Sequence, residues 1–258
     1  MIWHHIEKGQ GRPLVLLHGI GMNSDAWLPV MDRLAVERRV IAFDIPGFGL
    51  TPGLETGKPG AAEMAASLSQ SLQEMGIKEP VDLVGNSLGG RIALEAASMG
   101  LARSIVCISP AGLWKKTGPA HLEPLFNLMR KATNAMPDLV ERVLHNALGR
   151  TLIMSGAVAA QGWKMPVDDA VRSARMFAES RHFDPVFDAF RPPFAGASRV
   201  TVPCTIAFGD LDFVFPAFTR DKSRAPANTF WVRLPFCGHV PMWDNPERVS
   251  QVILRGTR

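Results

Sequence analysis

The chain has 258 residues and a formal net charge of +4; 47% of its residues are hydrophobic and 20% are charged. This composition is typical of a globular protein and excludes a largely disordered chain. No apolar run reaches the roughly 18 residues that a membrane span needs, and the basic residues do not cluster as they do in a nucleic-acid-binding surface. We therefore expect neither a membrane span nor a nucleic-acid partner. Because the N-terminal residues lack the layout of a signal peptide, we expect a cytoplasmic protein.

Strand and helix alternate over the first 109 residues. Short apolar runs predict strands at residues 3–7, 14–17, 39–43, 81–84 and 104–109. Segments with helical spacing lie between them, at residues 25–34, 61–75 and 88–98. This alternation is typical of an α/β fold, in which helices cover both faces of a mostly parallel sheet.

The pattern changes between residues 113 and 195. No strand-like run with a comparable apolar core occurs there, and apolar residues repeat at helical spacing. We expect several amphipathic helices, broken at Pro124, Pro137, Gly149, Pro166 and Pro185. Strands and a last helix then return, at residues 202–208, 229–234 and 245–254. We therefore interpret residues 1–112 and 196–258 as one core domain, and residues 113–195 as a helical cap inserted into it.

A possible nucleophile stands where the predicted strand at 81–84 turns into the next helix. The segment Gly85-Asn-Ser-Leu-Gly89 matches G-x-S-x-G in this strand–turn–helix context. The turn would present the Ser87 hydroxyl above the sheet edge, and the free N–H of Leu88 at the helix start could bind an oxyanion. The alternative is a structural turn in which Ser87 only caps the helix.

A serine nucleophile needs a base, and the base needs an orienting acid. Asp210 and Asp212 follow the strand at 202–208, and His239 follows the strand at 229–234. Loops after parallel strands meet at one edge of the sheet, so either acid could reach the histidine. The order serine, acid, histidine is that of one serine hydrolase plan.

These motifs together resemble the α/β-hydrolase fold family, in the group with a helical cap inserted after the sixth strand. The matching segments are His18-Gly19, Asp44-x-Pro-Gly-x-Gly49, Gly85-Asn-Ser-Leu-Gly-Gly90, Gly209-x-x-Asp212-x-x-x-Pro216 and Gly238-His239-x-Pro241. The resemblance implies that Ser87 is the nucleophile, Asp212 the acid and His239 the base. It also implies that the N–H groups of Ile20 and Leu88 form the oxyanion hole. It favours a structural role for His18, which precedes the oxyanion turn.

Aromatic and methionine side chains of the predicted cap are candidates for lining an acyl pocket, although packing within the cap would explain them equally. They are Trp114, Phe126, Met129, Trp163, Phe177, Phe187 and Phe190. We expect no metal and no cofactor, because the sequence has no dinucleotide fingerprint, P-loop or H-E-x-x-H pair and its three cysteines lack metal-site spacing.

Because a lining that includes methionine suits a tolerant pocket, we expect a carboxylesterase that hydrolyses small-molecule esters with small to medium acyl chains. Two alternatives stay open. One is a carbon–carbon bond hydrolase of the meta-cleavage-product type, although Met22, Asn23 and Val240 depart from the pattern that we associate with that group. The other is a hydrolase-like ligand receptor that keeps the three residues but turns over slowly or once. Oligomeric state has no signature in the sequence.

Overall fold

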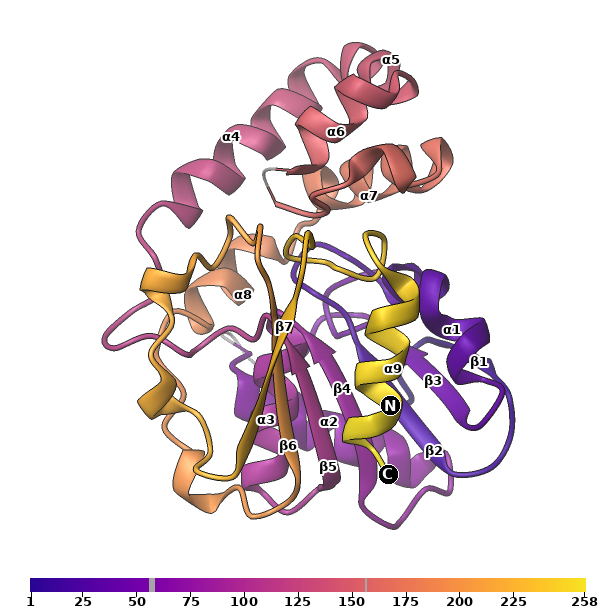
Figure 1. Ribbon diagram of the computed structural model, residues 1–258, viewed down its shortest axis with the longest axis vertical. Coiled ribbons are helices and arrows are strands. Elements are labelled where there is room, and N and C mark those ends of the chain that lie inside the picture. The colour runs from indigo at the N-terminus through magenta and orange to yellow at the C-terminus, as the bar shows by residue number, and fades with distance from the viewer. Residues whose placement is uncertain (56–58, 156) are drawn as a thin grey trace.

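The computed structural model describes residues 1–55, 59–155 and 157–258. These residues include a seven-stranded sheet (Figure 1). The strands are β1 (His5–Lys8), β2 (Pro13–Leu17), β3 (Arg39–Phe43), β4 (Val81–Asn86), β5 (Ala102–Ile108), β6 (Cys204–Gly209) and β7 (Thr229–Leu234). They lie in the order β1-β3-β2-β4-β5-β6-β7. Pairing is parallel throughout these residues except between β1 and β3. The mostly parallel sheet predicted from the sequence is confirmed.

The sheet is buried on both faces, which explains the continuous apolar runs of its central strands. In β2, Leu14 and Leu16 belong to one hydrophobic cluster, whereas Val15 and Leu17 belong to the other. Helices cover the first cluster with α1 (Leu28–Leu34) and α9 (Pro246–Gly256), and the second with α2 (Ala61–Glu74) and α3 (Leu88–Ser98). In Figure 1, α9 lies in front of the sheet, and α2 and α3 lie behind it. Successive residues of a strand point to opposite faces, so each strand serves both layers.

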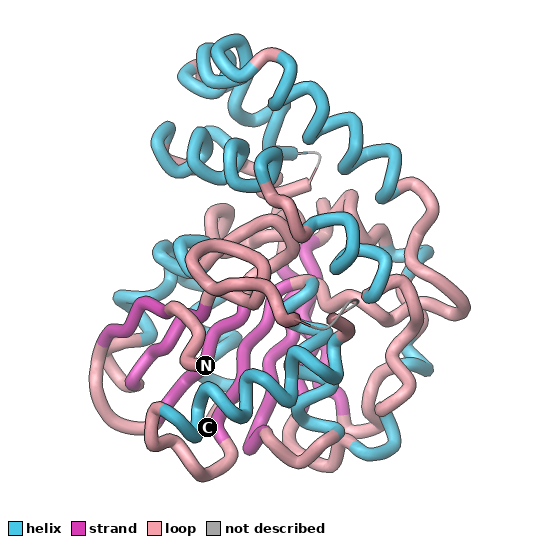
Figure 2. Tube along the Cα trace, turned by 180° about the vertical axis from the view of Figure 1, so that it is seen from behind, coloured by secondary structure: helices cyan, strands magenta, loops and turns pink. Residues whose placement is uncertain are grey.

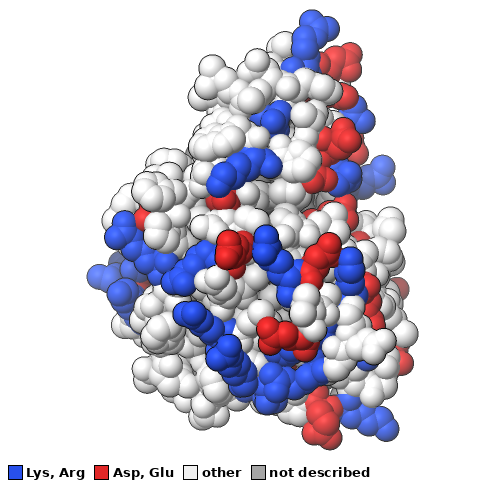
Figure 3. Space-filling model, turned by 45° about the vertical axis from the view of Figure 1, so that its right-hand side comes forward, with Lys and Arg blue, Asp and Glu red and all other residues white. Residues whose placement is uncertain are grey.

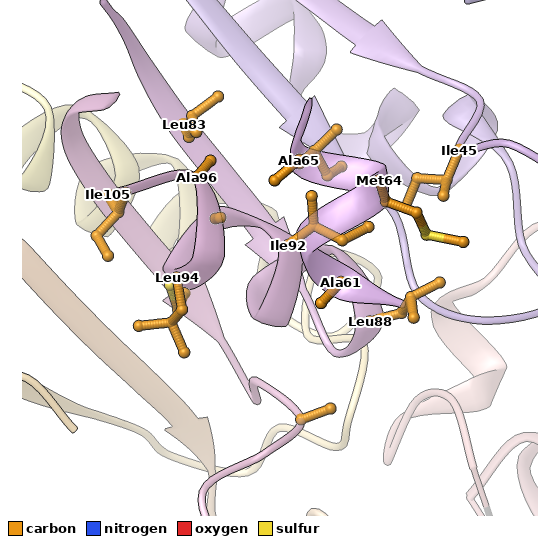
Figure 4. Close-up of a cluster of buried hydrophobic side chains, with 14 of the residues drawn as sticks. Ile45, Ala61, Met64, Ala65, Leu83, Leu88, Ile92, Leu94, Ala96 and Ile105 are labelled. Atoms are coloured by element: carbon orange, nitrogen blue, oxygen red, sulfur yellow. The ribbon is translucent and has the colours of Figure 1, made fainter. Parts of the chain in front are cut away.

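Packing between α2, α3 and the sheet fixes the start of α3. Figure 4 shows Met64 and Ala65 of α2 beside Ile92 of α3, with Leu83 of β4 close to Ala96. All five side chains are at most 1% exposed. Full burial of a side chain of the size of Ile92 contributes about 1.5–3 kcal/mol. Because α3 begins directly after Ser87, this packing also holds the turn that carries the serine.

The segment between β5 and β6 is helical. Its helices are α4 (Leu122–Ala135), α5 (Pro137–His145), α6 (Ala147–Ser155), α7 (Val167–Glu179) and α8 (Phe183–Ala189). Helices α4 to α7 gather beyond one end of the sheet, and α8 lies lower, beside the core (Figures 1 and 2). Among the described residues, five strands precede these helices. The insertion that the resemblance places after the sixth strand therefore follows β5 here. The division at residues 112 and 196 stays a prediction.

Most of the residues expected to break these helices lie in their first turns instead. Pro137 is the first residue of α5, and Pro124, Gly149 and Pro185 are each the third residue of their helices. The first four N–H groups of a helix have no intrahelical acceptor, so proline costs no hydrogen bond there. These residues therefore mark where the helices begin.

Charged side chains of both signs lie on the face shown in Figure 3. Ion pairs on the surface of the core include Lys8 with Asp32 at 2.6 Å and Arg39 with Glu7 at 2.8 Å. Such exposed pairs contribute at most about 1 kcal/mol each. Among the described residues, no helix combines the length and the hydropathy that crossing a bilayer requires.

Candidate active site

Ser87 lies at a sharp turn between β4 and α3, with a backbone φ of 54° and 6% of its surface exposed. A positive φ is uncommon for a residue with a side chain, and the surrounding structure must hold it there. A Cβ at Gly85 would lie 2.1 Å from the carbonyl oxygen of Gly89, and one at Gly89 would lie 2.2 Å from that of Leu17. Glycine is therefore required on both sides of the serine, as the motif predicts.

A carboxylate and an imidazole meet in the loops after β6 and β7. Asp212 Oδ1 lies 3.0 Å from His239 Nδ1 and accepts the N–H groups of Val214 at 3.0 Å and Phe215 at 2.9 Å. Burial favours the neutral acid and is the largest single effect on the pKa of Asp212. The facing His239 and the hydrogen bonds together outweigh it and hold that pKa below its ordinary value. The ionised form of Asp212 is therefore favoured, and it faces the imidazole.

Asn86, which sequence analysis did not assign a role, anchors the histidine loop. Its side-chain amide donates to the carbonyl oxygens of His239 at 2.9 Å and Ile108 at 3.2 Å. The residue is fully buried. A polar side chain at the last position of β4, directly before the candidate nucleophile, is the signal that could have indicated it.

The structure brings Ser87 and His239 to one cavity, together with Ile20 and Leu88. No hydrogen bond joins the Ser87 hydroxyl to His239 in the described part of the chain; such bonds are often long without substrate. The backbone N–H groups of Ile20 and Leu88 donate to no backbone oxygen of the described residues. They are therefore available to a ligand in the cavity.

Asp210 does not reach the imidazole. Its carboxylate pairs with Arg233 on the surface, and Asp210 is not among the described residues that line the cavity. The spacing could not separate Asp210 from Asp212, whereas the hydrogen bond to His239 does. A cation also lies near the second carboxylate oxygen: Arg220 Nη2 is 3.9 Å from Asp212 Oδ2. No motif in the sequence indicated that Arg220 would lie there.

His18 is held as a neutral structural residue. Its Nδ1 lies 2.7 Å from the carbonyl oxygen of Gly19, and its Nε2 accepts the N–H of Ile45 at 2.9 Å. One ring nitrogen thus donates and the other accepts, which is the neutral tautomer. Burial lowers the pKa of His18 from 6.5 to about 4, although the carbonyl of Gly19 and the nearby Asp44 oppose this. These contacts make His18 unavailable as a base.

A cavity of about 410 Å³ lies between the sheet edge and helices α4 to α7. Six of the seven proposed lining residues border it: Trp114, Phe126, Met129, Phe177, Phe187 and Phe190. Trp163 differs, because it is 52% exposed and is not among the described residues that line the cavity. The cavity also extends along residues that the aromatic pattern did not indicate, including Val140, Leu152, Ile153 and Val158. Most of the lining is apolar.

Loops that carry Ser87, Asp212 and His239 thus share one edge of a mostly parallel sheet, below a helical insertion. This arrangement is that of the α/β-hydrolase fold. A model of the alpha/beta hydrolase family matches residues 14–252, and the chain belongs to that family. No group of three or more His, Cys, Asp or Glu side chains suited to a metal ion occurs in the described residues.

Comparisons with known proteins give relatives of more than one activity. The chain is 27% identical over 260 residues to the 2-hydroxy-6-oxo-6-(2'-aminophenyl)hexa-2,4-dienoic acid hydrolase of Metapseudomonas resinovorans, spanning 97% of this chain and 85% of that protein. The fold of this chain is similar to that of naproxen esterase (carboxylesterase NP) from Bacillus subtilis. The TM-score is 0.76 and the identity is 20%, over 98% of this chain and 86% of that one. A thermophilic esterase from Thermogutta terrifontis gives a TM-score of 0.73 at 21% identity, covering 98% and 91%. The last two likenesses concern the fold.

Proposed function

We propose that this protein is a carboxylesterase that hydrolyses esters with small to medium acyl chains. The observation that supports this most is the apolar cavity of about 410 Å³ that both Ser87 and His239 line. Apolar walls with few polar groups suit a neutral acyl chain whose reacting carbonyl is the only polar part held in place. The hydrogen bond between Asp212 and His239 supports the role of the imidazole as a base.

In the proposed mechanism, His239 removes the proton of the Ser87 hydroxyl as its oxygen attacks the ester carbonyl carbon. The N–H groups of Ile20 and Leu88 stabilise the resulting oxyanion, an effect that typically contributes about 10²–10³ in rate for each donor. The imidazolium then gives its proton to the departing alcohol, which leaves an acyl-enzyme. A water molecule, deprotonated by His239, attacks this acyl carbon, and the proton returns to Ser87 as the acid leaves.

Hydrolysis of p-nitrophenyl esters by the Ser87→Ala variant tests the proposal. We expect turnover to fall by at least about 10³-fold, with the circular dichroism spectrum unchanged. A fluorophosphonate should label the unaltered protein once and the variant not at all. Undiminished hydrolysis by Ser87→Ala would refute the assignment. Rapid multiple turnover of any ester would argue against a ligand receptor, for which a single slow covalent event is expected.

Carbon–carbon bond hydrolysis is the second candidate, because the relative from Metapseudomonas resinovorans acts on a dienoic acid. Such a substrate carries a carboxylate, and Arg191 borders the cavity. That guanidinium is already paired with Glu123, at 2.8 Å, which favours the neutral ester. A panel of p-nitrophenyl esters of graded acyl length, run beside a coloured dienoate, distinguishes the two by their kcat/KM values.

A further inference from the structure

A second buried carboxylate lies behind the histidine loop. Asp244 is fully buried, although it is not among the described residues that line the cavity. Its Oδ2 accepts the N–H groups of Gly238 at 2.7 Å and Ala160 at 3.1 Å, and its Oδ1 accepts that of Gln161 at 2.6 Å. One carboxylate thus binds backbone from two segments that are almost eighty residues apart.

Further contacts join the same two segments, residues 158–164 and 236–244, and we call the boundary between them the seam. The N–H of Val240 donates to the carbonyl oxygen of Val158 at 2.8 Å, and Lys164 Nζ donates to the carbonyl oxygen of Asp244 at 2.9 Å. A Cβ at Gly238 would lie 2.7 Å from the backbone nitrogen of Ala160. The two segments are therefore in close backbone contact, and a side chain at residue 238 would separate them.

Both segments reach the cavity beside the seam. Residues 157 and 158 line it from the side of the helical insertion, and His239 and Val240 line it from the core. A movement that opened the seam would shift one wall of the cavity and the backbone of His239 together. The side-chain amide of Asn86 donates to the carbonyl oxygen of His239, which is a further contact to the same loop.

We propose that Asp244 is a positioning residue that fastens the segment 158–161 onto the His239 loop, and so fixes both the imidazole and one wall of the acyl pocket. Its three N–H donors come from the two segments that it joins. A residue needed only for the turn before α9 would not require the two donors from residues 160 and 161. The catalytic consequence rests on the proposed role of His239, whereas the contact itself does not.

The backbone amides around Asp244 offset part of the cost of burying its charged form. Burial raises the pKa of Asp244 above its ordinary value, while the three N–H groups and Lys164 oppose that rise. Among the described residues, no Lys or Arg side chain forms an ion pair with this carboxylate. Its compensation therefore comes from backbone amides, and losing one acceptor oxygen leaves buried N–H groups without partners.

The Asp244→Asn variant tests the proposal, because it keeps the shape but replaces one acceptor oxygen with a donor. We expect kcat for p-nitrophenyl acetate to fall about tenfold, as for the loss of a charge-assisted hydrogen bond. We expect KM to rise more for the octanoate than for the acetate, because the wall at residues 157–158 shifts. A variant that only lowered the folded fraction would reduce kcat equally for both esters. Asp32→Asn, on the surface of the core, is the matched control and should match the unaltered protein.

Amide hydrogen exchange of the same variant reports the seam without using activity. Exchange at residues 160, 161 and 238 should accelerate in Asp244→Asn and not in Asp32→Asn. Unchanged exchange at these residues would overturn the proposal even if the protein proved not to be an esterase. Faster exchange with unchanged kinetics for both esters would overturn the positioning role. If Asp244→Asn fails to fold, Gly238→Ala separates the same segments, and the same exchange and kinetic results decide.

Discussion

Asp212 and Asp244 are both buried carboxylates in loops at the same edge of the sheet, yet their pKa values move in opposite directions. Burial favours the neutral acid at both residues and is the largest effect at each. At Asp212 the facing His239 and several hydrogen bonds outweigh burial, and the pKa falls. At Asp244 three backbone N–H groups and Lys164 do not outweigh it, and the pKa rises. The facing imidazole is the largest effect that lowers the pKa of Asp212, and Asp244 has no such neighbour among the described residues.

This contrast separates two uses of a buried carboxylate. A carboxylate that must stabilise a developing imidazolium has to remain charged, and the facing imidazole and the hydrogen bonds to it favour that charged form. A carboxylate that joins two segments needs acceptor oxygens in the correct directions, and its charge has no partner to stabilise. The two residues should therefore respond differently to the same Asp→Asn substitution.

The largest effect is expected at the Asp212 site. Asp212→Asn should lower kcat for ester hydrolysis by about 10³–10⁴-fold, because the amide no longer favours the imidazolium or the required tautomer. Asp210→Asn is the matched control, since that residue lies two positions away and pairs with Arg233. The measurement is steady-state hydrolysis at saturating ester. If both variants lost activity to the same degree, Asp212 would have no special role.

His18 is buried and neutral and has no proposed part in the reaction, so its titration should affect stability instead of rate. The pKa of His18 is about 4 in the folded protein and 6.5 ordinarily, so between these values the unfolded chain binds the proton and the folded chain does not. The contribution of His18 to the free energy of unfolding is therefore constant above pH 6.5. As the pH drops towards 4, the free energy of unfolding falls by about 3 kcal/mol in total. Urea unfolding between pH 7.5 and 4.5 measures this loss. A His18→Gln variant with the same pH slope would contradict it.

Sequence alone predicted the sheet and the sharp turn at Ser87, because short stretches of sequence indicate each of them. Apolar side chains face both layers in β2 and at Leu83 and Val84 of β4, and the short motif around Ser87 contains the two glycines that close contacts require. Contacts between distant segments could not be predicted. The donors to Asp244 come from residues 160 and 161, and no local spacing relates the two. Trp163 was proposed from residue type alone, and only the tertiary structure places it half exposed at the surface.

Asn86 offers a smaller test of how the His239 loop is held. Its side chain makes two hydrogen bonds to backbone oxygens, one of them that of His239. Asn86→Ala should lower kcat about tenfold, in line with one or two lost hydrogen bonds. Asn228→Ala removes a similar bond, to the carbonyl oxygen of Val202, far from the cavity and should leave kcat unchanged. Equal kcat values for the two variants would exclude an anchoring role for Asn86.

The pH dependence of stability gives the smallest effect and the most direct test of the contrast between the two carboxylates. The folded pKa of Asp212 lies below its ordinary value of 3.8, so its charged form contributes stability above pH 3.8 that is lost as the pH falls. The folded pKa of Asp244 lies above 3.8, so the folded protein holds that proton more tightly, and stability is lost as the pH rises through the window above 3.8.

The stability difference between the unaltered protein and Asp212→Asn should therefore shrink on acidification. The corresponding difference for Asp244→Asn should shrink as the pH rises, because only the unaltered protein must then ionise a buried acid. Guanidinium unfolding of the three proteins from pH 3 to 6 measures both slopes; if the two slopes had the same sign, the facing histidine would not be what distinguishes these sites.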